Sequence, residues 1–310
     1  MSSVARRHFL TGLALAVTGS VLFSAKAIVV KLAYRHGVDA STLIALRMAF
    51  SVPFFIAALI WSSRDAPPLT RADHSRLIAI GLLGYYAASY LDFLGLQFIT
   101  AALERLILYL NPTIVLLMSA LFLGKRFNRR DLAALGLAYG GILLVFLHDV
   151  RLEGQGVPLG AALVFASAVC YAAYLVMSGE LVRRIGAIRL TSYAMCVSTV
   201  AVFLQFLVVN PFASLQQPAP VYWLSLVNGL LCTVLPVFAT MLAVERIGAG
   251  RASMAAMIGP VATIALAFVF LGETISSWQV AGTAFVLAGV YVLSRQPAAA
   301  AMGRTAGKEN

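Results

Sequence analysis

Charged residues are the scarcest feature of this 310-residue chain. Asp, Glu, Lys and Arg make up only 11% of it, whereas 61% of the residues are hydrophobic, and the mean hydropathy is +0.91. A soluble protein of this length would need far more charged surface. The shortage of charge therefore excludes an ordinary soluble protein.

Motifs of catalysis and metal binding are also missing. The chain contains no HExxH, no GxSxG and no Walker P-loop, which speaks against metalloprotease, hydrolase and ATP-driven chemistry. The three cysteines show no CxxC spacing and lie inside apolar runs, where they are typical of packing residues. Four histidines lie at the edges of the apolar runs, at positions 8, 36, 74 and 148. We therefore expect no enzyme, no metal and no cofactor.

The net charge is strongly positive, at +11 with a pI near 10.0. Such a charge can indicate a nucleic-acid partner. Here the basic residues occupy short links between apolar runs rather than one face, which is typical of cytoplasmic loops of membrane proteins. No nucleic acid is expected as a partner.

Ten apolar runs of about twenty residues follow one another, each long enough to cross a hydrocarbon core about 30 Å thick. Because backbone polar groups in lipid must be satisfied internally, such runs form helices or a closed barrel, and their continuous hydrophobicity excludes the barrel. The predicted spans are 10–33, 41–61, 76–97, 103–123, 132–148, 157–178, 190–209, 221–243, 252–271 and 278–295. The expected fold is an all-α membrane protein with ten transmembrane helices in a lipid bilayer.

Lys and Arg are distributed unevenly between the two sides that these spans define. With the N-terminus in the cytoplasm, 17 of the 23 Lys and Arg residues face the cytoplasm and 2 lie within spans. Only four face outward: Lys31, Arg35, Arg105 and Arg151. Since positive links stay in the cytoplasm, both termini are expected there.

The sequence matches itself at a constant offset of 148 residues, with Pro112 on Pro260 and Gly141 on Gly289. This predicts two five-span halves, 1–150 and 151–296, followed by a disordered tail at 297–310. An odd number of spans inserts the halves in opposite directions, as in transporters with inverted repeats. The offset also pairs the first span with the sixth, which favours a retained helix over the alternative of a removable export signal at Arg6-Arg7.

Several motifs resemble those of EamA-type transporters in the drug/metabolite transporter superfamily, across nearly the whole chain. They are Ile28-Val29-Val30-Lys31-Leu32, Leu46-Arg47-Met48, Asn111-Pro112 leading to Leu123-Gly124-Lys125, and Gly259-Pro260 leading to Leu271-Gly272-Glu273-Thr274. The resemblance implies a ten-helix carrier with a central cavity in the bacterial inner membrane, commonly an exporter of amino acids, metabolites or drugs. Two positions depart from the pattern: Lys125 replaces the usual Glu, and Lys26 replaces a small or amide residue.

Five ionisable residues lie toward the outer ends of the first four spans, where buried charge is costly and indicates function. They are Lys26, Arg47, Asp92, Glu104 and Arg105. We expect Arg47 to pair with Asp92, with Lys26 and Glu104 completing a network that gates a cavity or couples transport to protons. Glu104 and Arg105 are expected nearer the surface. The alternatives are a static pair that never titrates and side chains that extend outward to the membrane surface.

Polar aromatic residues predict the lining of a cavity. The candidates are Tyr85, Ser89, Tyr109, Tyr171 and Tyr174, of which the first two share a helix face with the aspartate of span three. Such a lining would suit aromatic, amphipathic or cationic organic solutes. The alternative is that these aromatics serve packing or anchor the helices at the interface.

Three prolines interrupt spans four, eight and nine: Pro112, Pro236 and Pro260. Each removes a backbone donor and frees the carbonyl four residues earlier. We expect kinks that act as hinges or offer carbonyls to a substrate, with a purely structural kink as the alternative.

Together these features predict a secondary carrier that exports small organic metabolites, such as amino acids, or drugs by alternating access. Protons are a candidate coupling ion, whereas the substrate and the oligomeric state are left open. The alternative from another class is an integral membrane enzyme or a receptor without transport activity.

Overall fold

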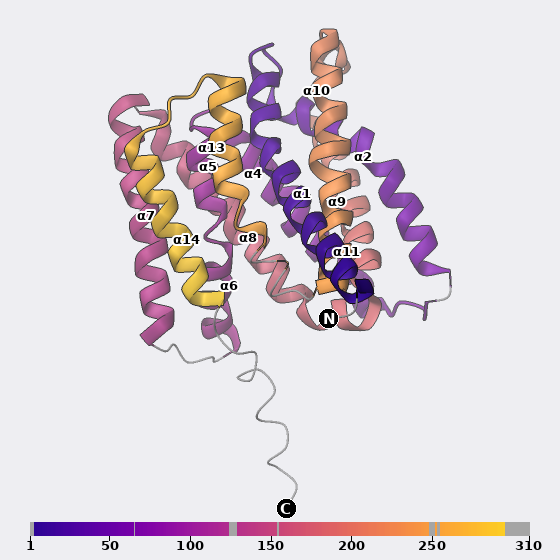
Figure 1. Ribbon diagram of the computed structural model, residues 1–310. Coiled ribbons are helices and arrows are strands. Elements are labelled where there is room, and N and C mark those ends of the chain that lie inside the picture. Colours follow the sequence, from indigo (N-terminus) through magenta and orange to yellow (C-terminus); the bar gives the residue numbers. More distant parts are fainter. Residues whose placement is uncertain are drawn as a thin grey trace, which may run out of the picture.

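The computed structural model describes residues 3–64, 66–123, 129–153, 155–247, 252 and 255–294, and these residues form helices joined by short links (Figure 1). The first half of the chain contains α1 (Ser3–Tyr34), α2 (Ala40–Ser63), α3 (Arg71–Gly81), η1 (Leu82–Ala87), α4 (Ala88–Gly95), α5 (Ala101–Leu108), α6 (Asn111–Leu123) and α7 (Arg129–Glu153). The second half contains α8 (Gly156–Ile185), α9 (Ala187–Val209), η2 (Phe212–Leu215), α10 (Ala219–Gly229), η3 (Leu230–Val234), α11 (Leu235–Ile247), α13 (Gly259–Leu266), η4 (Ala267–Leu271) and α14 (Ser277–Ser294).

The helices have the length and composition of membrane spans. Eight helical stretches are long and apolar enough to cross a membrane, and two shorter apolar helices follow them, Gly259–Leu271 and Ser277–Val292. No strand occurs in the described ranges. The protein is therefore a helical, multi-pass membrane protein, as its hydropathy predicts, with helix ends shifted by a few residues. The predicted tail at 297–310 and Lys125 lie outside the described residues.

The two ends of the bundle differ in what they contain. In Figure 1, α1 begins and α14 ends at the bottom, which we call the lower end. The link after α1 and the link between η4 and α14 lie at the top, which we call the upper end. The first described helix thus begins, and the last described helix ends, on the same side of the bundle.

Irregularities of the helices recur 148 residues apart. The π-helical turns η1 and η3 begin at Leu82 and Leu230, each inside an otherwise α-helical span. α6 begins at Asn111 and α13 at Gly259, each directly after a break in the helix. A wide turn and a break therefore occupy corresponding places in two stretches of the chain.

Helices α7 and α14, which correspond at this offset, lie side by side and approach each other at glycines. A methyl group added at Gly141 would lie 2.6 Å from the carbonyl oxygen of Gly282, and one added at Gly289 would lie 2.7 Å from that of Ala134. The later position on α7 thus meets the earlier position on α14, so the two helices run antiparallel. Each of the two contacts is also the counterpart of the other at the 148-residue offset.

Candidate functional site

A buried ion-pair network lies in the upper part of the bundle. The Nζ atom of Lys26 on α1 is 2.5 Å from Oδ2 of Asp92 on α4 and 3.1 Å from Oε1 of Glu104 on α5. The three residues are 6%, 3% and 0% exposed, respectively. Because an isolated charge is costly in a low-dielectric interior, one ammonium between two carboxylates offsets much of the cost of burying all three.

Arg47 on α2 makes a different contact from the one that the sequence suggests. The predicted pairing of Arg47 with Asp92 is wrong, because Asp92 pairs with Lys26 and no carboxylate forms an ion pair with Arg47 among the described residues. The guanidinium carbon of Arg47 instead lies 4.9 Å from the ring centroid of Phe93. Its Nε and Nη2 atoms are buried without a hydrogen-bond partner. A cation–π contact therefore takes the place of the expected ion pair.

Glu104 and Arg105 are both buried inside the helix bundle, at 0% and 5% exposed. The reason is the start of α5: its N-cap residue Thr100 is itself buried, accepts a hydrogen bond from Leu103 N at 3.1 Å, and donates to Asp149 on α7 at 3.0 Å. This cap fixes the first turn of α5 inside the bundle.

Arg105 contacts two aromatic rings and one hydroxyl. Its Nη2 atom donates to Oγ of Ser24 at 3.0 Å, and its guanidinium carbon lies 5.2 Å from the ring centroid of Phe23 and 5.3 Å from that of Tyr109. The Nε atom of Arg105 is buried without a partner. Arg105 is therefore a central residue of the site, although its sequence position suggests the membrane surface.

Two adjoining cavities of about 270 and 300 Å³ lie between the halves of the chain. Both are lined by Phe23, Tyr85, Arg105, Tyr109, Tyr171 and Val237. The upper cavity adds Lys26, Arg47, Ser89 and Asp92, and the lower cavity adds Tyr174, Pro236 and Thr240. The structure therefore brings the predicted site residues together around one hollow, with the fully buried Glu104 paired to Lys26 behind it.

Tyrosines form the boundary between the two cavities. The hydroxyl groups of Tyr85 on η1 and Tyr174 on α8 are 3.2 Å apart, and their rings meet edge to face with centroids 5.2 Å apart. The Tyr171 ring lies 5.2 Å from that of Tyr174. The two hydroxyl groups of the Tyr85–Tyr174 pair thus bond each other, and the cluster gives the hollow an aromatic wall.

The carbonyl that Pro112 leaves without an N–H partner is that of Leu108, and it accepts a hydrogen bond from a nearby residue of the same segment. Pro112 occupies the first turn of α6, and the carbonyl of Leu108 accepts a hydrogen bond from Nδ2 of Asn111 at 2.8 Å. Asn111 also lines the upper cavity. The helix is therefore interrupted beside the hollow, with its loose carbonyl satisfied by a side chain.

The carbonyl that Pro260 leaves without an N–H partner is that of Ala256, and it accepts hydrogen bonds from side chains of the first half of the chain. Ala256 accepts a hydrogen bond from Oγ of Ser20 on α1 at 2.7 Å and another from the hydroxyl of Tyr109. Pro236 lies in the first turn of α11, the helix that follows η3, and lines the lower cavity. The three prolines thus lie at irregular helix segments around the site.

An ion pair joins the two halves at the upper end. Nζ of Lys31 on α1 lies 3.3 Å from Oε1 of Glu273, and it also donates to the carbonyl of Ile99 at 2.8 Å. The same Glu273 oxygen accepts a hydrogen bond from Ala101 N at 3.3 Å. We call the Lys31–Glu273 pair the upper latch, because it links the end of α1 to the segment after η4.

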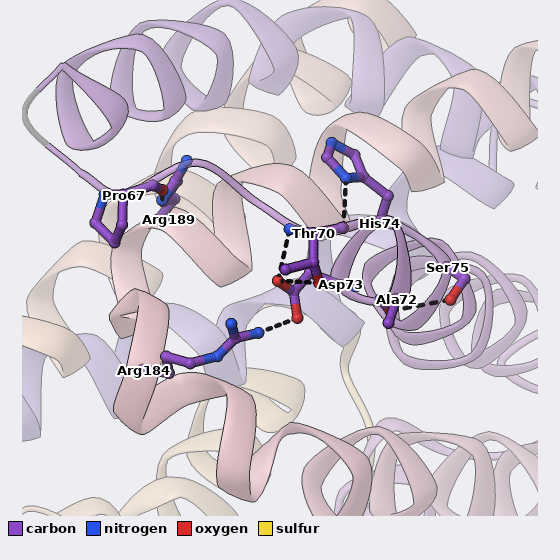
Figure 2. A network of polar contacts seen from close by, with 8 residues as sticks. All are labelled: Pro67, Thr70, Ala72, Asp73, His74, Ser75, Arg184 and Arg189. Atoms are coloured by element: carbon purple, nitrogen blue, oxygen red, sulfur yellow. Dashed lines mark hydrogen bonds and ion pairs between the residues drawn. The ribbon is translucent and has the colours of Figure 1, made fainter.

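A second ion pair joins the halves at the lower end. Figure 2 shows Asp73, in the first turn of α3, bonded to Thr70 in a capping box and to Nη2 of Arg184 near the end of α8. Nearby, Arg189 donates to the carbonyl of Pro67 at 2.9 Å. We call the Asp73–Arg184 pair the lower latch. Between them, the two latches hold the halves together at both ends of the bundle.

Fold and site together define a multi-pass membrane protein with a hollow between its helices that charged and aromatic side chains line. The chain belongs to the EamA-like transporter family, whose pattern matches residues 10–147 and again residues 158–295. The family expected from the sequence motifs is confirmed.

Two similar proteins are named as a transporter and as an efflux pump. The chain is 31% identical over 294 residues to "Uncharacterized transporter YcbK" of Bacillus subtilis, covering 92% of this chain and 94% of that protein. It is 25% identical over 264 residues to "Probable amino-acid metabolite efflux pump" of Salmonella typhimurium, covering 80% and 82%. A crystal structure of similar fold aligns with a TM-score of 0.64 at 19% identity, covering 91% of this chain and 95% of the other.

Proposed function

We propose that this membrane transporter is a secondary carrier that exports small organic metabolites by alternating access. Its two five-helix halves would be inserted in opposite orientations, giving ten transmembrane helices. The hollow between them would open in turn to either side. The observation that carries the proposal is one hollow, made of two adjoining cavities between the halves of the chain, with an ion pair joining the halves above it and another below it.

The inverted arrangement is supported by the antiparallel packing of corresponding helices. Besides α7 and α14, the start of α9 lies against the end of α2, where Nε of Arg189 donates to Oγ of Ser63 at 3.1 Å. The family pattern also matches twice, 148 residues apart. Two related bundles of opposite orientation can exchange roles, which makes an inward-open and an outward-open state similar in free energy.

The proposed orientation rests on the distribution of charge, and the proposed direction of transport rests on one relative. The basic links lie on the side of the lower end, which favours both termini in the cytoplasm of a cell whose inner membrane holds the protein. Export is supported by the efflux named for the Salmonella relative. Lys26, Asp92 and Glu104 form the candidate coupling site for protons, and Pro112, Pro236 and Pro260 are the candidate hinges.

Counterflow in proteoliposomes tests this proposal. The purified protein is reconstituted, and exchange of radiolabelled amino acids, aromatic acids and aromatic amines is measured with the unlabelled compound on the opposite side. A carrier shows uptake that is stimulated from the opposite side. An enzyme or a receptor moves none of the compounds faster than vesicles without protein, and that result would overturn the proposal.

A further inference from the structure

Two buried arginines in the upper cavity have N–H groups for which the described residues provide no hydrogen-bond acceptor. Arg47 and Arg105 are each 5% exposed, and both line this cavity. Nε and Nη2 of Arg47 and Nε of Arg105 are buried without a hydrogen-bond partner. A buried guanidinium without an acceptor is costly, so these atoms mark the place where a ligand's acceptor is most favourable.

The two carboxylates beside the cavity do not serve these arginines. Asp92 and Glu104 both pair with Lys26, which removes most of their capacity to attract a cationic ligand. With these groups in their usual charge states, the three cations and two carboxylates leave one positive charge uncompensated. The charge that balances the site is therefore a single negative charge on the ligand.

Four of the other residues that line the upper cavity are aromatic: Phe23, Tyr85, Tyr109 and Tyr171. The guanidinium carbon of Arg105 lies 5.2 Å from the ring centroid of Phe23 and 5.3 Å from that of Tyr109. Tyr85 and Tyr171 face the same hollow. A planar guanidinium favours a carboxylate through paired hydrogen bonds, and the rings favour a flat apolar body.

Resting on the proposed function, we infer that the upper cavity binds small organic monoanions, namely aromatic carboxylates, with the carboxylate on the guanidinium groups of Arg105 and Arg47. The cavity volume of about 270 Å³ suits a ligand of one or two rings. A free ammonium group on the ligand meets uncompensated positive charge, and the carboxylate that lines the cavity, Asp92, is already paired with Lys26, although its Oδ1 accepts no hydrogen bond. Zwitterionic amino acids and aromatic amines are therefore disfavoured relative to the corresponding acids.

A series of compounds with one ring system separates charge from shape. Radiolabelled indole-3-propionate is bound to the purified full chain in detergent and is displaced by tryptophan, tryptamine or indole-3-propionamide, which are zwitterionic, cationic and neutral. Because tryptamine and the amide lack the carboxylate, and because the ammonium group of tryptophan meets uncompensated positive charge, we expect the Kd of the acid to be at least about tenfold lower than that of any of the other three. Tryptophan or tryptamine binding as tightly as the acid would overturn the inference.

Substitutions of Arg47 and Arg105 test whether the ligand's carboxylate binds at these two residues. Arg105→Gln and Arg47→Gln are each expected to weaken binding of indole-3-propionate at least about tenfold, whereas Arg105→Lys weakens it less because the charge is kept. The matched control is Arg129→Gln, which removes an exposed charge at the start of α7 and should leave the Kd unchanged. Thermal unfolding establishes that each variant is folded, and two separate arginines guard against the loss of one variant. Unchanged binding in both Gln variants would overturn the inference.

Measuring both binding of the acid and counterflow shows whether this inference or the proposed carrier function fails. Binding of the acid without any counterflow would overturn the carrier proposal and leave the anion site standing. Counterflow of tryptophan or tryptamine without binding of the acid would do the reverse.

Discussion

The hydroxyl of Tyr109, directly after α5, donates a hydrogen bond to the carbonyl of Ala256, directly before the break that precedes α13. This carbonyl is available because Pro260, four residues later, has no N–H to offer it. Ser20 on α1 donates to the same oxygen at 2.7 Å. The interrupted span of the second half is therefore held by side chains of the first half, beside the hollow.

Replacing this tyrosine tests the link. In Tyr109→Phe, the Ala256 carbonyl keeps its bond from Ser20, so the free energy of unfolding is expected to fall by only about 1 kcal/mol. The control is Tyr90→Phe on α4, where the ring stacks on Tyr86 with centroids 6.5 Å apart. Thermal unfolding in detergent should separate the two variants. An equal effect of both would contradict a specific role for the Tyr109 hydroxyl.

The close approach of α7 and α14 gives a prediction with a neighbouring control. In Gly141→Ala, the added methyl group would lie 2.6 Å from the Gly282 carbonyl oxygen, a backbone atom that cannot move aside alone. We expect a loss of about 1–3 kcal/mol in the free energy of unfolding. In Gly140→Ala the methyl group meets nothing within 4 Å, so a neutral or stabilising effect is expected. If Gly140→Ala proves the more destabilising change, the packing of these two helices is incorrect.

A substitution in the ion-pair network can distinguish an effect on stability from an effect on transport. Asp92→Asn keeps the shape of the side chain and leaves Lys26 paired with Glu104, so the protein should fold and accumulate normally. If the Asp92 charge takes part in coupling or gating, counterflow drops at least about tenfold, which corresponds to 1.4 kcal/mol. Undiminished exchange would show that the carboxylate is a static structural charge.

Lys26→Met is the contrasting change. It leaves two buried carboxylates without their shared ammonium, and breaking a buried pair in this way costs about 3–5 kcal/mol. We expect poor accumulation and a lower unfolding temperature. The triple variant with Asp92→Asn and Glu104→Gln should recover part of the loss, because neither carboxyl position then carries a buried negative charge without its ammonium. Failure of the triple variant to recover would assign the loss to packing of the lysine stem instead.

The helical, multi-pass character of the chain, and several of the residues that gather around the hollow, could be predicted from the sequence. Apolar runs are a local signal that the bilayer thickness makes reliable, and charges inside such runs are rare enough to mark function. Tyr85, Tyr109, Tyr171 and Tyr174 line the cavities as their spacing suggests.

The partners within the site could not be predicted. Asp92 pairs with Lys26 rather than Arg47 because the rotation of packed helices decides which side chains meet, and similar depth does not determine rotation. Arg105 is central because the buried cap at Thr100 starts α5 inside the bundle. The π-helical turns at Leu82 and Leu230 fall on a repeated Gly-Leu-Leu, which signals duplication but not a wider turn.

Cys232 reports on the opening of the hollow, since it lines the upper cavity and is only 2% exposed. A chain with Cys170→Ala and Cys196→Ala keeps it as the single thiol. Labelling by a membrane-impermeant thiol reagent, in vesicles of both orientations, then measures access from each side. Releasing the lower latch with Asp73→Asn, or the upper latch with Glu273→Gln, should shift the balance between the two states. Because Arg184 is half exposed, the lower latch contributes about 0.2–1 kcal/mol, so its release changes the labelling rate up to about fivefold.

This labelling of Cys232 tests alternating access most directly. Two related halves that rock around one hollow predict labelling from both sides of the membrane, faster from the lower side in Asp73→Asn and faster from the upper side in Glu273→Gln. Labelling from one and the same side in all variants would contradict a carrier with alternating access.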